Sequence, residues 1–118
     1  MGKAPISPLQ PRDFLILLAL ADGERHGYGL IKEIHELTDG AVRMDPANLY
    51  RAIKRLLRDG LVEDRGRRPA AQARDERRRY YAMTSEGRRV AAGEAGRLEK
   101  LTAVARSRHL IPEPGGSL

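Results

Sequence analysis

The most restrictive feature of the sequence is an amphipathic helix predicted at residues 46–59. Residues typical of helix termini stand at both of its ends. Asp45 is a good N-cap residue, Pro46 occupies the first helical position, where a missing N–H group costs nothing, and Gly60 ends the helix. The fold must therefore bury one side of this helix and leave a basic side in solvent. The apolar side consists of Leu49, Ile53, Leu56 and Leu57, and the cationic side of Arg51, Lys54, Arg55 and Arg58.

Two further helices are predicted before this one. Residues 14–21 are apolar on every side and follow Pro11, which suits a first helical turn, so this helix should be the most buried element. Residues 22–25 break it, and a second helix follows at residues 27–38. The residues of the second helix with inward spacing are Tyr28, Leu30, Ile31, Ile34 and Leu37.

A β-hairpin is predicted after the marked helix. Residues 61–64 and 79–83 have strand-like composition, and the stretch between them is rich in arginine and lacks a helical or strand period. Tyr80 and Tyr81 point to opposite faces of the second strand, so one of them should lie in the core. The hairpin should therefore carry a long, basic tip.

The last predicted helix, at residues 86–108 with Thr84 or Ser85 as its cap, is too long to pack wholly on so small a core. Its apolar stripe is thin, which is typical of a helix that finds its partner on another chain. We therefore expect a homodimer with an interface formed by Val90, Ala91, Leu98, Leu101, Val104 and Ala105.

The length of 118 residues allows one compact domain with an appended helix. Three helices followed by a hairpin with a charged loop is the order of a winged helix-turn-helix domain, a mainly α fold with a small β-hairpin, whose third helix enters the DNA major groove. We expect a flexible arm at residues 1–8, the winged-helix DNA-binding domain at residues 9–83, a dimerisation helix at residues 84–109 and a disordered tail at residues 110–118.

Several classes of protein are disfavoured by what the sequence lacks. Cysteine is absent, which rules out disulfides, thiolate metal sites and cysteine nucleophiles, and favours a cytoplasmic protein. The longest apolar run, residues 14–21, is far shorter than the ~20 residues that a bilayer requires. His26, His35 and His109 have no spacing for a shared metal, and we expect each at the ordinary surface. No nucleophile–base pair, glycine-rich phosphate loop or spaced carboxylate pair is recognisable, so we expect neither an enzyme nor a bound cofactor.

The net charge of +6 is concentrated in the middle of the chain. Residues 43–79 contain 12 Lys or Arg and 6 acids, whereas the two flanks together cancel to zero. Within that region the net charge is +3 for residues 46–59 and +5 for residues 65–79. Charges that only keep a protein soluble would not be expected to gather on the third helix and the hairpin tip rather than on the other two helices. The distribution therefore predicts a surface that binds the phosphates of nucleic acid.

The third helix carries the candidate DNA-reading residues. Arginine can donate two hydrogen bonds to guanine and asparagine can pair with adenine, so Asn48 and Arg51 are predicted to read bases. The alternative for Asn48 is that it helps to satisfy the helix start. The cations farther along, Lys54, Arg55 and Arg58, are predicted to contact phosphates, with plain solvent exposure as the alternative.

Two tyrosines and the hairpin tip, called the wing in such domains, could add contacts. Tyr28 and Tyr50 could each pack by the ring and send the hydroxyl to a phosphate, or have a purely structural role. Arginines of the wing can lie along phosphates or enter the minor groove. The wing candidates are Arg67, Arg68, Arg74, Arg77, Arg78 and Arg79.

Several separated segments of the sequence resemble the signature blocks of the PadR-like regulators, in the same order and spacing. The resemblance covers about residues 9–100. Because several motifs agree, no single one of them has to support it. The segments are residues 26–31 (HGYGLI), residues 48–53 (NLYRAI) with Leu56, residues 59–62 (DGLV), residues 79–81 (RYY) and residues 84–88 (TSEGR).

The resemblance implies a one-component regulator of bacteria or archaea, with a winged-helix domain and a C-terminal helical part that forms a homodimer. In that family the dimer commonly represses genes, and in some members a small-molecule effector releases it. The two-fold symmetry of a dimer implies a pseudo-palindromic operator. The single C-terminal helix is that of the short subfamily, and the chain has no tryptophan to form an aromatic drug pocket. The identity of an effector is therefore not implied, nor is an operator sequence.

A second hypothesis keeps the winged-helix fold but changes the partner. The seven arginines of residues 65–79 would then serve an acidic protein partner or structured RNA. The first hypothesis predicts a salt-dependent affinity for duplex DNA, and the second predicts a preference for RNA or no duplex binding.

Overall fold

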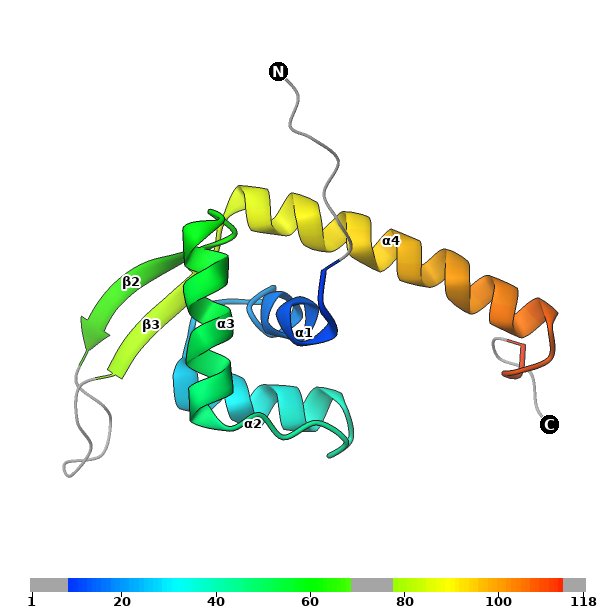
Figure 1. Ribbon diagram of the computed structural model, residues 1–118, viewed down its shortest axis with the longest axis horizontal. Coiled ribbons are helices and arrows are strands. Elements are labelled where there is room, and N and C mark those ends of the chain that lie inside the picture. The colour runs from blue at the N-terminus through cyan, green and yellow to red at the C-terminus, as the bar shows by residue number, and fades with distance from the viewer. Residues whose placement is uncertain (1–8, 69–77, 114–118) are drawn as a thin grey trace, which may run out of the picture.

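The computed structural model describes residues 9–68 and 78–113, which form four helices and a three-stranded antiparallel sheet (Figure 1). The arm expected at residues 1–8 and the end of the expected tail, residues 114–118, lie outside the described residues, as do Arg74 and Arg77 of the wing. The elements follow one another as α1 (Pro11–Ala19), β1 (Arg25–His26), α2 (Gly27–Leu37), α3 (Pro46–Arg58), β2 (Val62–Arg68), β3 (Arg78–Met83) and α4 (Ser85–Ser107).

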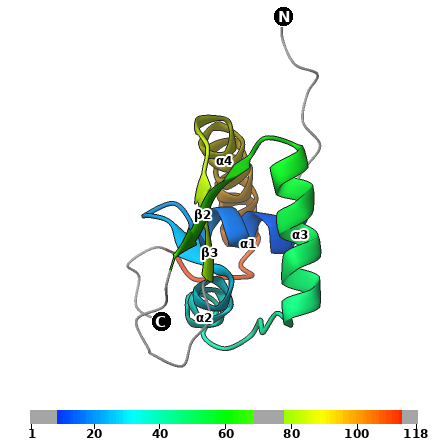
Figure 2. The same cartoon turned by 90° about the vertical axis from the view of Figure 1, so that its left-hand side faces the viewer.

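Helix α1 lies at the centre of the molecule and contacts each of the other three helices (Figures 1 and 2). It begins at Pro11, as predicted, and its buried residues include Ile16, Leu17 and Ala19, whereas Leu18 on the other side is 42% exposed. The core is therefore built around α1. It includes Ile16, Leu17, Leu30, Ile34, Leu49, Ile53, Leu56, Val62 and Tyr81.

Helix α2 begins directly after His26, whose ring Nδ1 accepts a hydrogen bond from the backbone N–H of Gly29 at 3.0 Å. His26 is therefore an N-cap and not the ordinary surface residue that was expected. Tyr28 and Leu37 were predicted to face inward, but they are 66% and 45% exposed. At 3.6 residues per turn Tyr28 lies about 120° around the helix from the buried Ile34, and Leu37 is the last residue of the helix.

Helix α3 has the ends that the sequence predicts. Oδ1 of Asp45 accepts a hydrogen bond from the backbone N–H of Asn48 at 2.8 Å, and Gly60 follows the C-cap with a φ of 76°. One side of the helix is buried against α1, α2 and β2, so the helix is mounted firmly with its other side outward. The buried residues are Leu49, Ala52, Ile53 and Leu56.

The sheet has the strand order β1–β3–β2, and both pairs are antiparallel. Strands β2 and β3 form the predicted hairpin, but their pairing extends farther toward the tip, to Arg68 opposite Arg78. Strand β1 was not predicted, because two residues are too few to show an alternating pattern. It pairs Arg25 with Tyr81 and His26 with Tyr80. Strand β3 is therefore central and ties the hairpin to the start of α2.

Helix α4 begins after Thr84, whose hydroxyl accepts a hydrogen bond from the N–H of Gly87 at 2.9 Å and donates to the carbonyl of Gly60 at 2.7 Å. Its first turns pack on α1, with Val90 buried, and the rest extends away from the globule (Figure 1). None of the described helices combines the length and apolar character that a membrane span requires. The fold is a winged helix-turn-helix domain with a projecting C-terminal helix.

Candidate nucleic-acid interface

The first turn of α3 carries a chain of three polar side chains. Asp45 accepts two hydrogen bonds from Asn48, one from the backbone N–H and one from the side-chain amide, both at 2.8 Å. The amide oxygen of Asn48 accepts in turn from Nη2 of Arg51 at 2.7 Å. Asn48 thus has a structural role at the helix start, which was the alternative considered for it. It also holds the guanidinium of Arg51 in a defined direction.

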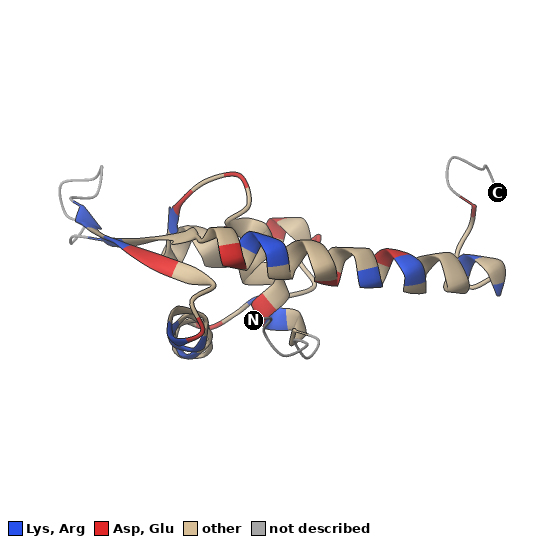
Figure 3. Cartoon of the chain, turned by 90° about the horizontal axis from the view of Figure 1, so that it is seen from above, with Lys and Arg blue, Asp and Glu red and all other residues tan. Residues whose placement is uncertain are grey.

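The four cations of α3 have different surroundings. Lys54 and Arg58 are exposed, as expected. Arg55 turns toward α1, where its Nη2 donates to Oδ1 of Asp13 at 2.7 Å and the Asp13 side chain is only 10% exposed. This differs from the expected solvent-facing position, because a carboxylate so nearly buried needs a charged partner. In Figure 3, α3 is seen nearly end-on with blue segments along it, and more blue lies at the outer end of the hairpin.

Tyr50 of α3 packs toward the start of α2. Its hydroxyl end lies against Gly27 at the start of α2, and the residue is 47% exposed. Tyr50 therefore has a packing role and also keeps an exposed surface. That surface belongs to an open groove between α3 and β3, lined by Ala47, Tyr50, Arg51, Ile53, Lys54, Leu57 and Tyr81.

One face of the hairpin carries a mixed set of charges. Tyr81 is buried, which confirms that one of the two tyrosines lies in the core, and Arg67 and Arg79 are near it. Nη1 of Arg79 donates to Oδ2 of Asp64 at 2.6 Å. The pKa of Asp64 is lowered, first by the hydrogen bond from the N–H of Gly66 and also by Arg79. Asp64 therefore stays ionised and offsets part of the positive charge of this face.

The opposite face of the hairpin turns toward β1 and the start of α2. The rings of Tyr80 and His26 meet edge-on with centroids 5.3 Å apart, and the guanidinium of Arg68 lies 4.5 Å from the centroid of Tyr80. Nη1 of Arg78 is 2.9 Å from Nε2 of His26, and its guanidinium is 5.7 Å from the ring centroid of Tyr28. Tyr28 thus contacts the wing, and Arg68 and Arg78 are both engaged within the chain.

The apolar stripe of α4 divides into two parts. Val90 belongs to the core and Ala91 packs against it, so these two residues, predicted as dimer interface, are occupied within the chain. The outer part is more open, and Ala105 there is half-buried. Its larger residues are 37% (Leu98), 53% (Leu101) and 43% (Val104) exposed.

Two acids that sequence reasoning did not single out organise the basic surface. Asp13 binds Arg55, and Glu24, in the turn between α1 and β1, binds Arg68 and lies near Arg65. The sequence signal for both is weak. Asp13 stands directly before the apolar run of residues 14–21, in the first turn of α1, where acids are common. Glu24 lies in a turn, where an acid is ordinary. Among the residues that the structure describes, no group of three or more His, Asp or Glu is placed to hold a metal ion.

Comparisons with known proteins agree with this architecture. Residues 16–93 match the family model of the transcriptional regulator PadR-like family. A transcriptional regulator from Clostridium thermocellum has a similar structure, with a TM-score of 0.65 and 27% identity over 81% of this chain and 87% of that chain. A PadR family transcription regulator from Clostridium difficile has a TM-score of 0.67 and 21% identity over 81% of this chain and 95% of that chain.

A third relative was solved together with nucleic acid. Bacillus subtilis PadR, in complex with operator DNA, has a TM-score of 0.56 and 21% identity over 69% of this chain and 44% of that chain. At this identity the likeness concerns the fold. A comparison with curated proteins gives no match.

Proposed function

The chain belongs to the PadR-like family of transcriptional regulators, and on this premise we propose that it is a sequence-specific DNA-binding repressor that acts as a homodimer in the cytoplasm. In this proposal α3 enters the major groove, and the wing meets the backbone or the minor groove beside it. The operator is a pseudo-palindrome with half-sites about one helical turn apart or a little more. The protein regulates without catalysis or a cofactor, and a small molecule can act as its effector.

The chain of contacts from Asp45 through Asn48 to Arg51 is the observation that carries the proposal. A guanidinium has five N–H donors, and the bond to Asn48 uses one of them, so Arg51 retains donors for the two acceptors of guanine. Orienting the side chain in advance reduces the entropy lost on binding. In Asn48, by contrast, both atoms that would pair with adenine are already engaged, the amide nitrogen with Asp45 and the amide oxygen with Arg51. We therefore assign base reading first to Arg51, with Asn48 as the residue that orients it.

The remaining exposed cations are assigned to the DNA backbone. Lys54 and Arg58 lie on the outward side of α3, where Arg58 pairs with its exposed neighbour Asp59 at 3.4 Å. Tyr50 lines the same open groove as Lys54. Arg55 is left out of this set because Asp13 already binds it. Phosphate contacts of this kind fix the register of the protein and carry no sequence information.

The test is fluorescence anisotropy of a labelled duplex from upstream of the protein's own gene, against a scrambled duplex, across a salt series. We expect the native duplex to be bound in preference to the scrambled one. The slope of log K against log salt should be roughly −0.9 for each phosphate contacted. Arg51→Met should reduce that preference by about fivefold or more, because a bidentate base contact is lost. Arg89→Met is the control, since Arg89 lies on α4 and pairs there with Glu86.

Two results would contradict the proposal. One is binding that stays flat across the salt series, and the other is equal, weak binding to both duplexes. A preference for structured RNA, or binding to an acidic protein without duplex binding, would favour the second hypothesis instead.

A further inference from the structure

Glu24 connects the turn between α1 and β1 to the wing. Its two carboxylate oxygens accept hydrogen bonds from the two terminal nitrogens of Arg68: Oε2 from Nη1, and Oε1 from Nη2 at 3.1 Å. Nη1 of Arg65 lies 3.9 Å from the same Oε1. The bond from Arg68 is the main cause of a lowered pKa of Glu24, which keeps this carboxylate charged. A bidentate pair of this kind defines direction as well as distance.

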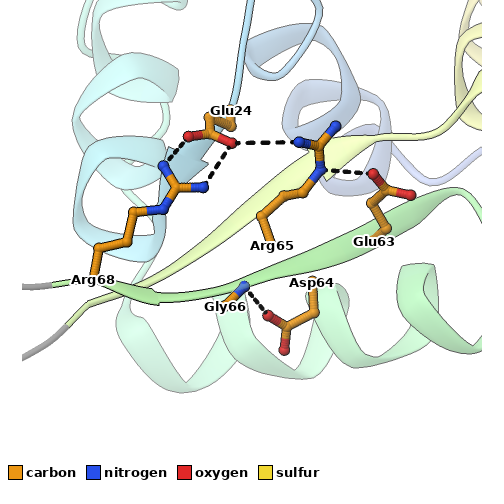
Figure 4. Close-up of polar contacts among 6 residues, drawn as sticks. All are labelled: Glu24, Glu63, Asp64, Arg65, Gly66 and Arg68. Carbon is orange, nitrogen blue, oxygen red and sulfur yellow. Dashed lines mark hydrogen bonds and ion pairs between the residues drawn. The ribbon is translucent and has the colours of Figure 1, made fainter.

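A bulge in β2 places Arg65 and Arg68 on one side of the hairpin. In a regular strand, residues three apart point to opposite faces. Here the register shifts between Asp64 and Gly66, and Gly66 has a φ of 89° with its N–H donated to Oδ1 of Asp64 at 2.7 Å. Figure 4 shows that Arg65 and Arg68 both reach Glu24, whereas Asp64 points to the other side of the strand. The bulge thus turns both arginines to the side of the hairpin on which Glu24 lies.

Arg67 and Arg68 are adjacent in β2, but Arg68 is held by other side chains whereas Arg67 is exposed. The guanidinium of Arg68 is held from a second direction by the ring of Tyr80, 4.5 Å from the centroid. Arg67 is exposed near Tyr81, and within the described parts of the chain it makes no hydrogen bond or ion pair. Moving to a DNA phosphate would cost Arg68 two charge-assisted hydrogen bonds and a cation–π contact. Arg67 would give up no such contact.

We propose that Glu24 is a positioning residue, which sets the angle of the wing to the helical core by holding Arg68 and Arg65, and that Arg67 is the arginine at this end of β2 that contacts phosphate. The inference rests on the proposed DNA binding. It removes Arg68 from the set of predicted DNA contacts, and it makes an acid, Glu24, necessary for full affinity to a polyanion.

Four single variants of the full chain test the inference: Glu24→Gln, Arg68→Met, Arg67→Met and Glu63→Gln. Glu63→Gln is the matched control, because it removes the same charge from an exposed acid that pairs with Arg65 at 2.7 Å within β2 itself. Duplex affinity is measured for each by anisotropy across a salt series. Arg67→Met should reduce the slope of log K against log salt by about 0.9, the value of one phosphate contact.

The two partners of the proposed pair should behave differently from Arg67. Arg68→Met should weaken binding without changing the slope, by about threefold to fivefold at every salt concentration. Glu24→Gln should do the same relative to Glu63→Gln. The double variant of Glu24 and Arg68 should bind no more weakly than either single variant, as expected for two partners in one interaction.

Backbone hydrogen exchange of the free protein gives a readout that does not involve DNA. Glu24→Gln and Arg68→Met should speed exchange in β2 and β3, whereas Arg67→Met and Glu63→Gln should not. The inference is overturned if Arg68→Met reduces the salt slope as much as Arg67→Met does. It is also overturned if Glu24→Gln binds duplex more tightly than Glu63→Gln, since Glu24 would then compete with DNA. If the unmodified protein binds no duplex, the proposed function fails, and the exchange rates still decide whether Glu24 holds the wing.

Discussion

Gly87 lies in the first turn of α4, where the helix crosses the backbone that follows α3. A Cβ atom added at Gly87 would lie 2.0 Å from the carbonyl oxygen of Leu61 and 2.9 Å from its carbonyl carbon. That oxygen cannot move aside freely, because it also accepts the N–H of Thr84 at 3.1 Å. Gly96, in the same helix, has no atom within 4 Å of an added Cβ. The two glycines therefore offer a matched pair of positions.

We expect Gly87→Ala and Gly96→Ala to change the free energy of unfolding in opposite directions. Gly87→Ala should lower it by about 1–3 kcal/mol, because overpacking forces the backbone to shift. Gly96→Ala should raise it by about 0.5–1 kcal/mol, because alanine loses less conformational freedom than glycine in a helix. Urea unfolding measures both. A Gly87→Ala protein as stable as the unmodified one would contradict the close crossing of α4 and Leu61.

Single residues were predictable from the sequence when their partners were close in the chain. The role of Asp45 as a cap depends on residues within one helical turn, and the structure confirms it. The ion pair of Asp13 and Arg55 joins residues 42 apart, and that of Glu24 and Arg68 joins residues 44 apart. No local pattern contains such pairs, because they depend on how the elements pack. Both pairs change the expected roles of cations at the candidate interface.

At the scale of elements, one side of α4 is buried against the globule in its first half and exposed to solvent in its second half. Val90, Glu94, Leu98 and Leu101 follow one another at spacings of four, four and three, which places them along the same side of the helix. Val90 and Glu94 are 6% and 8% exposed, whereas Leu98 and Leu101 are 37% and 53% exposed. The stripe that packs on the globule thus continues past it, as expected for a surface that receives another helix.

We expect the unmodified protein to be a dimer at micromolar concentration and Leu101→Glu to be a monomer. A charge in the outer stripe would have to be buried without a partner in the interface. Leu37→Glu is the control, because Leu37 on α2 is 45% exposed and lies outside α4. Light scattering distinguishes the two states. A monomeric unmodified protein, or a Leu101→Glu variant that still dimerises, would contradict the role of the stripe.

The existence and order of the helices and of the hairpin followed from the sequence, but the extent of the sheet did not. The first strand was expected to end at residue 64, because the arginine-rich stretch after it has no strand period. In the structure the strand continues to Arg68 through a bulge between Asp64 and Gly66, which a sequence pattern of period two does not reveal. Strand β1 has only two residues, and its pairing with β3 is a consequence of the tertiary fold.

At the scale of the whole molecule, acids in three separate regions respond to pH in the same way. The pKa of Glu24 is lowered mainly by Arg68, that of Asp64 by the N–H of Gly66, and that of Glu94 by its hydrogen bond from Arg97. The folded protein therefore holds these carboxylates in the charged form more strongly than the unfolded chain does. Their stabilisation is present above the ordinary values of 3.8 for Asp and 4.5 for Glu and is lost as pH falls through the lower native values.

We expect the melting temperature to stay nearly constant from about pH 7 to pH 5 and to fall as the pH is lowered below that range. Glu94→Gln should lower the melting temperature at neutral pH and make the acid decline shallower, so that the two curves converge once Glu94 is protonated in the folded protein. Glu99→Gln, an exposed position on the same helix, should leave the curve unchanged. Calorimetry across the pH series checks this, and parallel curves for Glu94→Gln and the unmodified protein would contradict it.

The projection of α4 also has a mechanical consequence. The helix is packed as far as Glu94, and its last 13 residues, 95–107, span about 20 Å at a rise of 1.5 Å per residue. If the angle at which such a segment leaves the globule changes by about 10°, its far end moves by about 3.4 Å. That displacement is close to the ~3.4 Å rise of one base pair. In a dimer held together by this segment, a tilt of that size at its base would shift the two globules relative to each other by about one base pair.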